Sequence, residues 1–279
     1  MWPSLFKPVI VLLAIAAIVY AAIAGIVYFK QRSFLYFPSQ EIRKSAPGFQ
    51  TVKFRTNDGL TLAAGYHAAQ VGRPTLLAFH GNAADWQSMA HSLRPLIDRG
   101  YGVLSVEYRG YQGNPGNPSE VGIYEDGRAA LRWLGSNGVP PGQVVAVGNS
   151  LGSGVAVQLA TETPMRALVL VSPMSSMVRL ASAQMSWLPV NLLLRDRYDN
   201  LAKLPVVEVP IMILHGGSDT VIPIREGRML ASRNRAAILV EFPRVGHELM
   251  YDPVVESSIT RFLREIPNHP TQRQTPAGT

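Results

Sequence analysis

Cysteine is absent from the 279 residues of this sequence. Its absence excludes a disulfide framework, a zinc site built from thiolates and a cysteine nucleophile. It does not indicate whether the protein meets a reducing or an oxidising compartment. Hydrophobic residues make up 47% of the chain, which is enough for a substantial core. The length suits one large domain with a short appendage.

Acidic residues are nearly absent from the first 55 residues, where seven lysines and arginines stand against the single acid Glu41. This part therefore carries most of the net charge of +7, and the remainder of the chain is close to neutral. A nucleic-acid-binding protein would carry its basic surface on the folded domain. The distribution argues against nucleic acid and favours a membrane as the partner.

Two further absences concern cofactors. Histidines and acidic residues do not occur at the spacings of metal ligands. The chain also lacks the G-x-x-x-x-G-K-[ST] loop that holds nucleotide phosphates. We therefore expect neither a metal nor a cofactor.

The basic residues flank the most hydrophobic segment, residues 9–29, which contains no charged side chain. At about 1.5 Å per residue, a helix of this length spans roughly 30 Å, the thickness of a bilayer core. We expect residues 1–32 to be a retained N-terminal anchor with one transmembrane helix. A cleaved signal peptide is the alternative, with the small residues 22–24 as its cleavage site, although the apolar run continues beyond them.

The side of the membrane on which the following domain lies is not settled by charge. Lys7 precedes the apolar segment, whereas Lys30, Arg32, Arg43 and Lys44 follow it. By the positive-inside bias, this pattern favours a single-pass protein with a cytoplasmic domain. Large domains can cross regardless of that bias, so the opposite orientation stays open.

Beyond the anchor, strand-like and helix-like segments alternate. Two strands are expected around the turn at residues 57–59, Asn-Asp-Gly, the best hairpin signal of the chain. The later order predicts an α/β fold over residues 33–266, with a mostly parallel, doubly wound sheet and helices on both faces. Residues 267–279 are rich in proline, glutamine and threonine and are expected to be a disordered tail.

One connection between strands, residues 173–209, is longer than the others. It contains Met174, Met177, Trp187 and Leu188, among other apolar residues. Such a segment could form a small lid over an apolar pocket. A helix packed on the sheet, with its connector, is the alternative and the more ordinary interpretation.

The motif G-x-S-x-G occupies residues 148–152, between a short β-branched run and a helical segment. A serine at such a strand-to-helix turn sits on a strained backbone, and the flanking glycines let neighbouring backbone approach. This pattern favours Ser150 as a nucleophile. An ordinary turn with a helix-capping serine is the alternative.

A nucleophilic serine needs a base, and the base needs an acid that holds its tautomer. In doubly wound hydrolases these residues follow one another as serine, acid and histidine. Of the six histidines, His247 alone combines a place after Ser150 with a loop at the carboxyl end of a strand. Asp219 follows the preceding strand and is the expected acid. Asp196 and Asp199 come before that strand and are expected to pair with neighbouring arginines.

The oxyanion that forms during acyl transfer needs two backbone N–H donors. One is expected from Leu151, directly after the nucleophile. The other is expected from Asn82, or from its neighbour Ala83, in the loop after TLLAFHG. His80 and His215 each end a strand, where a buried and hydrogen-bonded role is common.

The chain resembles the membrane-anchored serine α/β-hydrolases of the group that contains protein depalmitoylases and lysophospholipases. The resemblance covers most of residues 33–262 and rests on blocks in order: SFLYFP, NDGLTL, FHGNA, EYRGYQGNPGNPSEVGIYEDGRAAL, GNSLGSGVAVQLA, LLRDRYDNLAKL, HGGSDTVIP and GHELMYDP. It implies an α/β-hydrolase fold, the catalytic triad Ser150, Asp219 and His247, and an oxyanion hole at Asn82 and Leu151. Two departures are an asparagine before the nucleophile and the turn GYQGNPG.

Together these patterns predict a serine hydrolase that cleaves a carboxylic ester or thioester through an acyl-enzyme. The substrate would be a small-molecule or lipid-like acyl compound. A peptidase on the same fold is one alternative, although no clamp for a peptide terminus is visible. A non-enzymatic membrane scaffold is another. The sequence indicates neither the acyl-chain length nor the oligomeric state.

Overall fold

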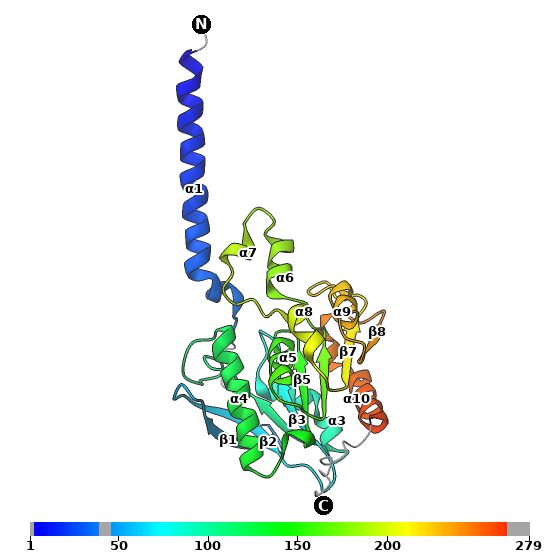
Figure 1. Ribbon diagram of the computed structural model, residues 1–279. Coiled ribbons are helices and arrows are strands. Elements are labelled where there is room, and N and C mark those ends of the chain that lie inside the picture. The colour runs from blue at the N-terminus through cyan, green and yellow to red at the C-terminus, as the bar shows by residue number, and fades with distance from the viewer. Residues whose placement is uncertain (1–2, 39–45, 267–279) are drawn as a thin grey trace, which may run out of the picture.

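The computed structural model describes residues 3–38 and 46–266. The expected disordered tail, residues 267–279, therefore lies outside the described residues, as do Arg43 and Lys44. The first described element is α1 (Pro3–Leu35), a helix of 33 residues whose N-terminal part stands away from the rest of the molecule (Figure 1). Its segment Lys7–Leu35 is long and apolar enough to cross a bilayer, with a mean hydropathy that reaches 2.9 over a window of 18 residues.

In the described part of the chain, eight strands form one sheet in the order β1-β2-β4-β3-β5-β6-β7-β8. The strands are β1 (Gln50–Arg55), β2 (Thr61–His67), β3 (Thr75–Phe79), β4 (Gly102–Val106), β5 (Val144–Asn149), β6 (Ala167–Val171), β7 (Ile211–Gly216) and β8 (Ala237–Phe242). β1 and β2 form the expected antiparallel hairpin, and β3 to β8 are parallel. The prediction of a mostly parallel sheet is confirmed.

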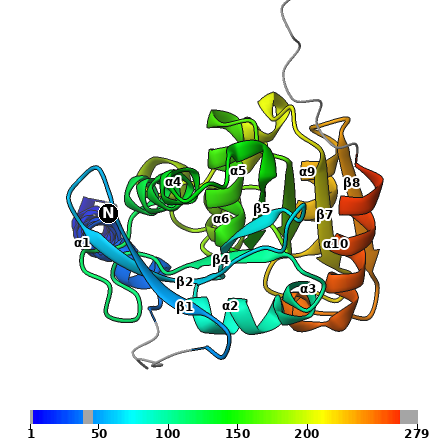
Figure 2. The same ribbon diagram turned by 90° about the horizontal axis from the view of Figure 1, so that it is seen from below.

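Helices cover both faces of this sheet (Figure 2). One face carries α4 (Glu120–Ser136), α5 (Gly152–Glu162), α8 (Asn200–Lys203) and α9 (Ile224–Ala231). The other carries α2 (Trp86–Ser92), α3 (Arg94–Ile97) and α10 (Pro253–Glu265). The side chains of a strand alternate between faces, so Leu77 and Phe79 of β3 enter one core and Leu76 and Ala78 the other.

The connection 173–209 divides into two parts. Its first part contains α6 (Met177–Gln184) and α7 (Val190–Leu193), which project beside the lower end of α1 (Figure 1). Its second part returns through α8 to the sheet, where Leu204 and Val207 are buried in the core. We call residues 177–194, which include α6 and α7, the lid.

Parallel strands bring the candidate site together at one edge of the sheet. β3 and β5 are neighbours, with Phe79 paired to Gly148, so the loops that follow them begin side by side. The loops after β7 and β8 leave the same edge. In such open sheets, reactive groups gather where the strands end.

Candidate active site

The turn after β5 holds Ser150 in a strained conformation, with φ at 51°. A side chain is rarely stable in this left-handed region, and the α/β-hydrolase nucleophile elbow is a known exception. Both glycines of the motif are required because neighbouring backbone atoms leave no room for a side chain. A Cβ on Gly148 would overlap the backbone of Gly152, and a Cβ on Gly152 would overlap the carbonyl of Phe79.

The structure brings the three predicted triad residues into one hydrogen-bonded chain. His247 Nε2 lies 3.1 Å from Ser150 Oγ, and His247 Nδ1 lies 2.8 Å from Asp219 Oδ2. His247 begins the short 3-10 helix His247–Tyr251 that follows β8, and Asp219 lies in the turn after β7. The three side chains therefore come from three different strand ends and meet at one point.

Asp219 is held in its charged form. Its buried side chain accepts hydrogen bonds from the backbone N–H of Val221 and Ile222, at 2.9 and 2.8 Å. Burial alone would raise the pKa of Asp219, but the His247 ring and these two N–H groups together lower it below the usual carboxyl value. A carboxylate here keeps the proton of His247 on Nδ1 and leaves Nε2 free to accept the serine proton.

His215 supports the turn that carries the acid. It is fully buried, and its Nε2 lies 2.8 Å from the carbonyl oxygen of Ile222, whose N–H contacts Asp219. Burial lowers the pKa of His215, so the ring is neutral near neutrality and serves as a hydrogen-bonding brace. This is the buried, hydrogen-bonded role that its position at a strand end indicated.

The expected oxyanion donors lie beside the nucleophile. Leu151 follows Ser150 directly, and a Cβ added to Gly81 would lie 3.4 Å from that of Ser150, so the loop after β3 touches the elbow. The backbone hydrogen bonds of the described turns, loops and helix caps do not include one donated by the N–H of Asn82 or Leu151. Both residues line the same pocket as Ser150. The arrangement leaves two donors for a developing negative charge.

The side chain of Asn82 has a role that the sequence did not indicate. Its Nδ2 donates to the carbonyl of Leu35 at 2.6 Å, and its Oδ1 accepts from the N–H of Phe37 at 3.0 Å. The hydroxyl of Tyr111 donates to the same Oδ1 at 2.8 Å. Asn82 therefore fastens the end of α1 to the loop between β3 and α2, residues 80–85, which we call the oxyanion loop because it holds an expected donor. The block SFLYFP after the anchor was the only sequence signal for this contact.

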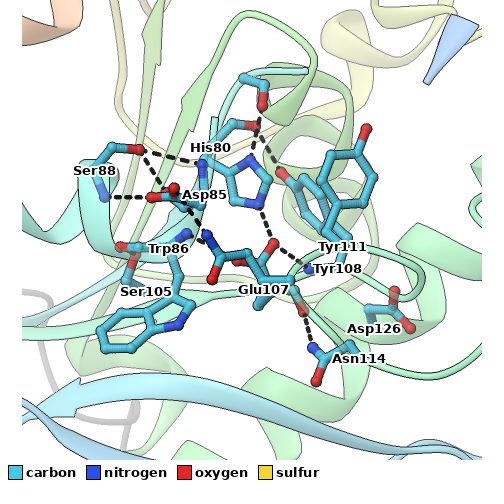
Figure 3. Close-up of polar contacts among 12 residues, drawn as sticks. His80, Asp85, Trp86, Ser88, Ser105, Glu107, Tyr108, Tyr111, Asn114 and Asp126 are labelled. Carbon is cyan, nitrogen blue, oxygen red and sulfur yellow. Dashed lines mark hydrogen bonds and ion pairs between the residues drawn. The ribbon is translucent and has the colours of Figure 1, made fainter. Parts of the chain in front are cut away.

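A buried polar layer lies behind the oxyanion loop (Figure 3). His80 Nε2 lies 2.8 Å from Glu107 Oε1, and the hydroxyl of Tyr108 donates to the carbonyl of His80 at 2.8 Å. Glu107 also accepts the backbone N–H of Trp86 at 3.1 Å. Asp85 caps α2 by accepting the N–H of Ser88. Both ends of the loop are thus fixed, which keeps its N–H groups in place before any substrate arrives.

A pocket of about 860 Å³ opens from the triad toward α1. Its floor includes Ser150 and His247, and its walls come from the oxyanion loop, the lid and the C-terminal turns of α1. The sequence suggested the connection 173–209 as a possible wall. It did not indicate that α1 supplies another one, because nothing in an apolar anchor segment distinguishes a face that lines a pocket.

The two other aspartates considered as acids lie elsewhere. Asp196 is buried and pairs with Arg32 of α1 at 2.9 Å, not with a neighbouring arginine as expected. The reason is that the chain around Asp196 runs past the end of α1. Asp199 accepts the N–H of Ala202 and caps α8.

Comparisons with known proteins bear on the fold of the chain. The profile of the family described as "Alpha/beta hydrolase family" matches residues 76–200. An uncharacterised protein of Mycobacterium tuberculosis is 38% identical over 226 residues, which cover 78% of this chain and 80% of the relative. The human "Alpha/beta hydrolase domain-containing protein 17B" is 31% identical over 184 residues, covering 64% of this chain and 62% of the relative.

Among solved structures, an esterase from Pyrococcus furiosus superposes with a TM-score of 0.66 at 20% identity. The superposition covers 82% of this chain and 98% of the esterase. At this identity the likeness establishes the fold alone. The predicted α/β-hydrolase fold is confirmed, and residues 76–200 of this chain match the alpha/beta hydrolase family.

Proposed function

We propose that the protein is a membrane-anchored serine hydrolase that cleaves a carboxylic ester or thioester. The observation that carries this proposal is the continuous hydrogen-bonded chain Ser150–His247–Asp219 at the foot of an apolar pocket. The family match over residues 76–200 supports a hydrolase in general, and the triad geometry supports acyl transfer in particular.

Each residue has a defined part in the proposed reaction. The Oγ of Ser150 attacks the acyl carbonyl while His247 Nε2 accepts its proton, and the N–H groups of Leu151 and Asn82 stabilise the oxyanion. His247 then gives the proton to the departing alcohol or thiol, which leaves an acyl-serine. A water molecule, deprotonated by His247, attacks the acyl-serine, and collapse of the second oxyanion releases the acid and restores Ser150.

Fluorophosphonate labelling tests the nucleophile. The full-length protein in detergent should be labelled once, and digestion should map the label to Ser150. Ser150→Ala should lose the label and nearly all ester hydrolysis, whereas the exposed control Ser257→Ala should keep both. Label on another serine, or hydrolysis unchanged in Ser150→Ala, would overturn the proposed function and favour a scaffold.

The membrane part of the proposal rests on α1. Val9, Leu12, Leu13 and Ile18 are all at least half exposed, so the N-terminal turns of α1 present apolar side chains all around, and no other part of residues 3–38 and 46–266 covers them. Such a helix is stable in lipid and unfavourable in water. We expect the mature protein to stay with membranes after carbonate extraction. N-terminal sequencing that found residue 25 as the first residue would establish a cleaved signal peptide instead.

A further inference from the structure

The lid contacts α1 at two levels. We call the turn around Trp187 the tip of the lid, and the segment around Leu193, where the chain leaves the lid, its base. At the tip, the Tyr20 hydroxyl donates to the carbonyl of Trp187 at 3.1 Å, and the two rings meet edge-on with centroids 6.3 Å apart. At the base, the Gln31 side chain donates to the carbonyl of Leu193 at 3.1 Å and accepts the N–H of Arg195 at 2.7 Å. The contacts therefore span eleven residues of α1, or about 16 Å of helix.

A buried polar junction fixes this arrangement just below the lid. Asp196 is 3% exposed and pairs with Arg32 at 2.9 Å. The hydroxyl of Tyr36 donates to Asp196 at 3.1 Å and lies 2.9 Å from the hydroxyl of Tyr198. Separating α1 from this junction would leave Asp196 buried without its charge partner, which is costly. The lid and α1 therefore behave as one body.

The same turns of α1 that contact the lid also present a free apolar face. Ile26 is 60% exposed and Phe29 is 79% exposed, and both lie between Tyr20 and Gln31 in the sequence. An exposed apolar face on an anchor helix is one that lipid covers. A bilayer that covers these turns must also surround the lid tip, which lies level with them.

The exposed side chains of the lid fit this placement. Trp187 is 54% exposed and Leu192 is 78% exposed, although both are large and apolar. The chain directly after the lid is basic instead: the guanidinium of Arg195 lies 4.3 Å from the ring centroid of Tyr28, two residues before Lys30. Exposed apolar side chains thus extend from Trp187 at the tip to Leu192 near the base, and the cations follow directly after them, which matches the order of acyl layer and headgroups.

The pocket lies between these two elements. Val27 and Phe34 of α1 line one side, and Met185 and Leu188 of the lid line another. The same pocket continues down to Ser150. Its upper walls are therefore formed by the two elements that stand in the apolar layer, and its lower end is the reacting serine.

From these observations we infer that the lid tip inserts into the bilayer beside α1, and that the acyl chain of a membrane-resident substrate passes from the lipid directly into the pocket. This inference rests on the proposed ester or thioester hydrolase and names its substrate class: an acyl compound whose chain already lies in the bilayer. The chain would then reach Ser150 between α1 and the lid without crossing water, while the bond to be cleaved stays at the headgroup level.

The depth of the lid can be measured directly because the chain has no cysteine of its own. Leu192→Cys places one nitroxide label on the lid, and Val71→Cys places one on an exposed turn before β3, at the opposite edge of the sheet from the site. In full-length protein in phosphatidylcholine nanodiscs, the Leu192 label should be accessible to oxygen and shielded from an aqueous nickel complex. The Val71 label should show the reverse. Equal access of the nickel complex to both labels would overturn the inference.

The route by which the substrate enters is tested by placing a negative charge at position 192. We expect Leu192→Asp to lower the ratio of two rates, hydrolysis of a palmitoyl ester embedded in vesicles over hydrolysis of a soluble acetate ester. A fall of about tenfold or more is expected, because a carboxylate opposes insertion into the apolar layer. The matched variant Val71→Asp should leave the ratio unchanged.

The two proposals fail in different ways. If Leu192→Asp keeps the wild-type ratio while fluorophosphonate still labels Ser150, the entry route is wrong and the hydrolase stands. If Ser150→Ala hydrolyses the soluble ester as fast as the wild type, the hydrolase itself is wrong.

Discussion

The hydrogen bonds around Asp219 decide which ring nitrogen of His247 carries the proton. Because the pKa of Asp219 is lowered in the folded protein, its charge adds stability above the usual carboxyl range, and this contribution is lost as the pH falls through the folded value. Near neutrality the carboxylate is fully present. The proposed general base therefore keeps its acceptor nitrogen toward Ser150 at that pH.

Asp219→Asn should test this role. The amide keeps the size of the side chain but can donate to Nδ1, which favours the wrong tautomer of His247. We expect kcat on a soluble ester to fall by roughly 10⁴-fold, with the far-UV circular dichroism unchanged. The exposed control Asp98→Asn should keep wild-type kcat. A fall of less than tenfold in Asp219→Asn would place the acid elsewhere, with nearby Glu248 as the first candidate.

Gly152 and Gly135 form a matched pair that tests how tightly the backbone packs around the turn at Ser150. A Cβ on Gly152 would overlap the carbonyl of Phe79, whereas a Cβ on Gly135, near the end of α4, would meet nothing within 4 Å. We expect Gly135→Ala to raise the melting temperature by about 2 °C, since alanine is about 0.5–1 kcal/mol better in a helix. Gly152→Ala should lower it by several degrees and slow labelling of Ser150. Thermal unfolding in detergent measures both, and equal shifts would contradict the packing of the elbow.

At the scale of elements, the end of α1 and the oxyanion loop are joined by one side chain. Asn82 makes hydrogen bonds to Leu35, Phe37 and Tyr111, so its amide is occupied with the protein itself. The same residue is expected to offer its backbone N–H to the oxyanion. The position of the anchor is thereby connected to the geometry of the proposed reaction.

Asn82→Ala should separate these two roles. The backbone donor remains in the variant, so the loss should be smaller than the 10²- to 10³-fold that follows removal of an oxyanion donor. We expect kcat on a soluble ester to fall by about tenfold with KM nearly unchanged, because the loosened loop fails mainly in the transition state. Asn137→Ala, at the exposed end of α4, is the control. A change in KM alone would show that Asn82 acts through ground-state binding.

The elements that the sequence predicts best are those with local signals. The Asn-Asp-Gly turn marks the hairpin, short apolar runs mark the buried strands, and the order of Ser150, Asp219 and His247 along the chain places each at a strand end. The contacts of α1 with the lid have no such signal. Gln31 and Arg195 are 164 positions apart, and a charge pair such as Arg32–Asp196 cannot be chosen from the many possible ones by spacing. Only the folded chain shows which surfaces meet.

At the scale of the whole molecule, α1 and the lid add two walls to a pocket in an α/β body, and in the proposed placement this pocket opens toward a bilayer. The connection 173–209 can be interpreted from the sequence either as a small lid or as a helix packed on the sheet, and each interpretation describes part of it. Residues around α8 pack on the sheet, whereas α6 and α7 project beside α1, with Met177 and Leu180 of α6 still packed against the core (Figure 1). Apolar content alone could not separate these parts, because methionine and leucine suit a core and a pocket wall equally well.

We expect this pocket to make the rate of the proposed reaction depend on the length of the acyl chain. Each methylene that leaves water contributes about 0.8 kcal/mol, so two more carbons can raise kcat/KM by no more than about fifteenfold until the chain outgrows the pocket. We expect kcat/KM of the full-length protein to rise from acetate through longer esters. Met185→Ala removes a wall of the pocket and should flatten that rise, whereas Met229→Ala, on α9, should not. A steady fall from acetate upward, with the same profile in Met185→Ala, would mean that the proposed substrate has a short acyl group and that the apolar walls serve only to hold the lid against α1.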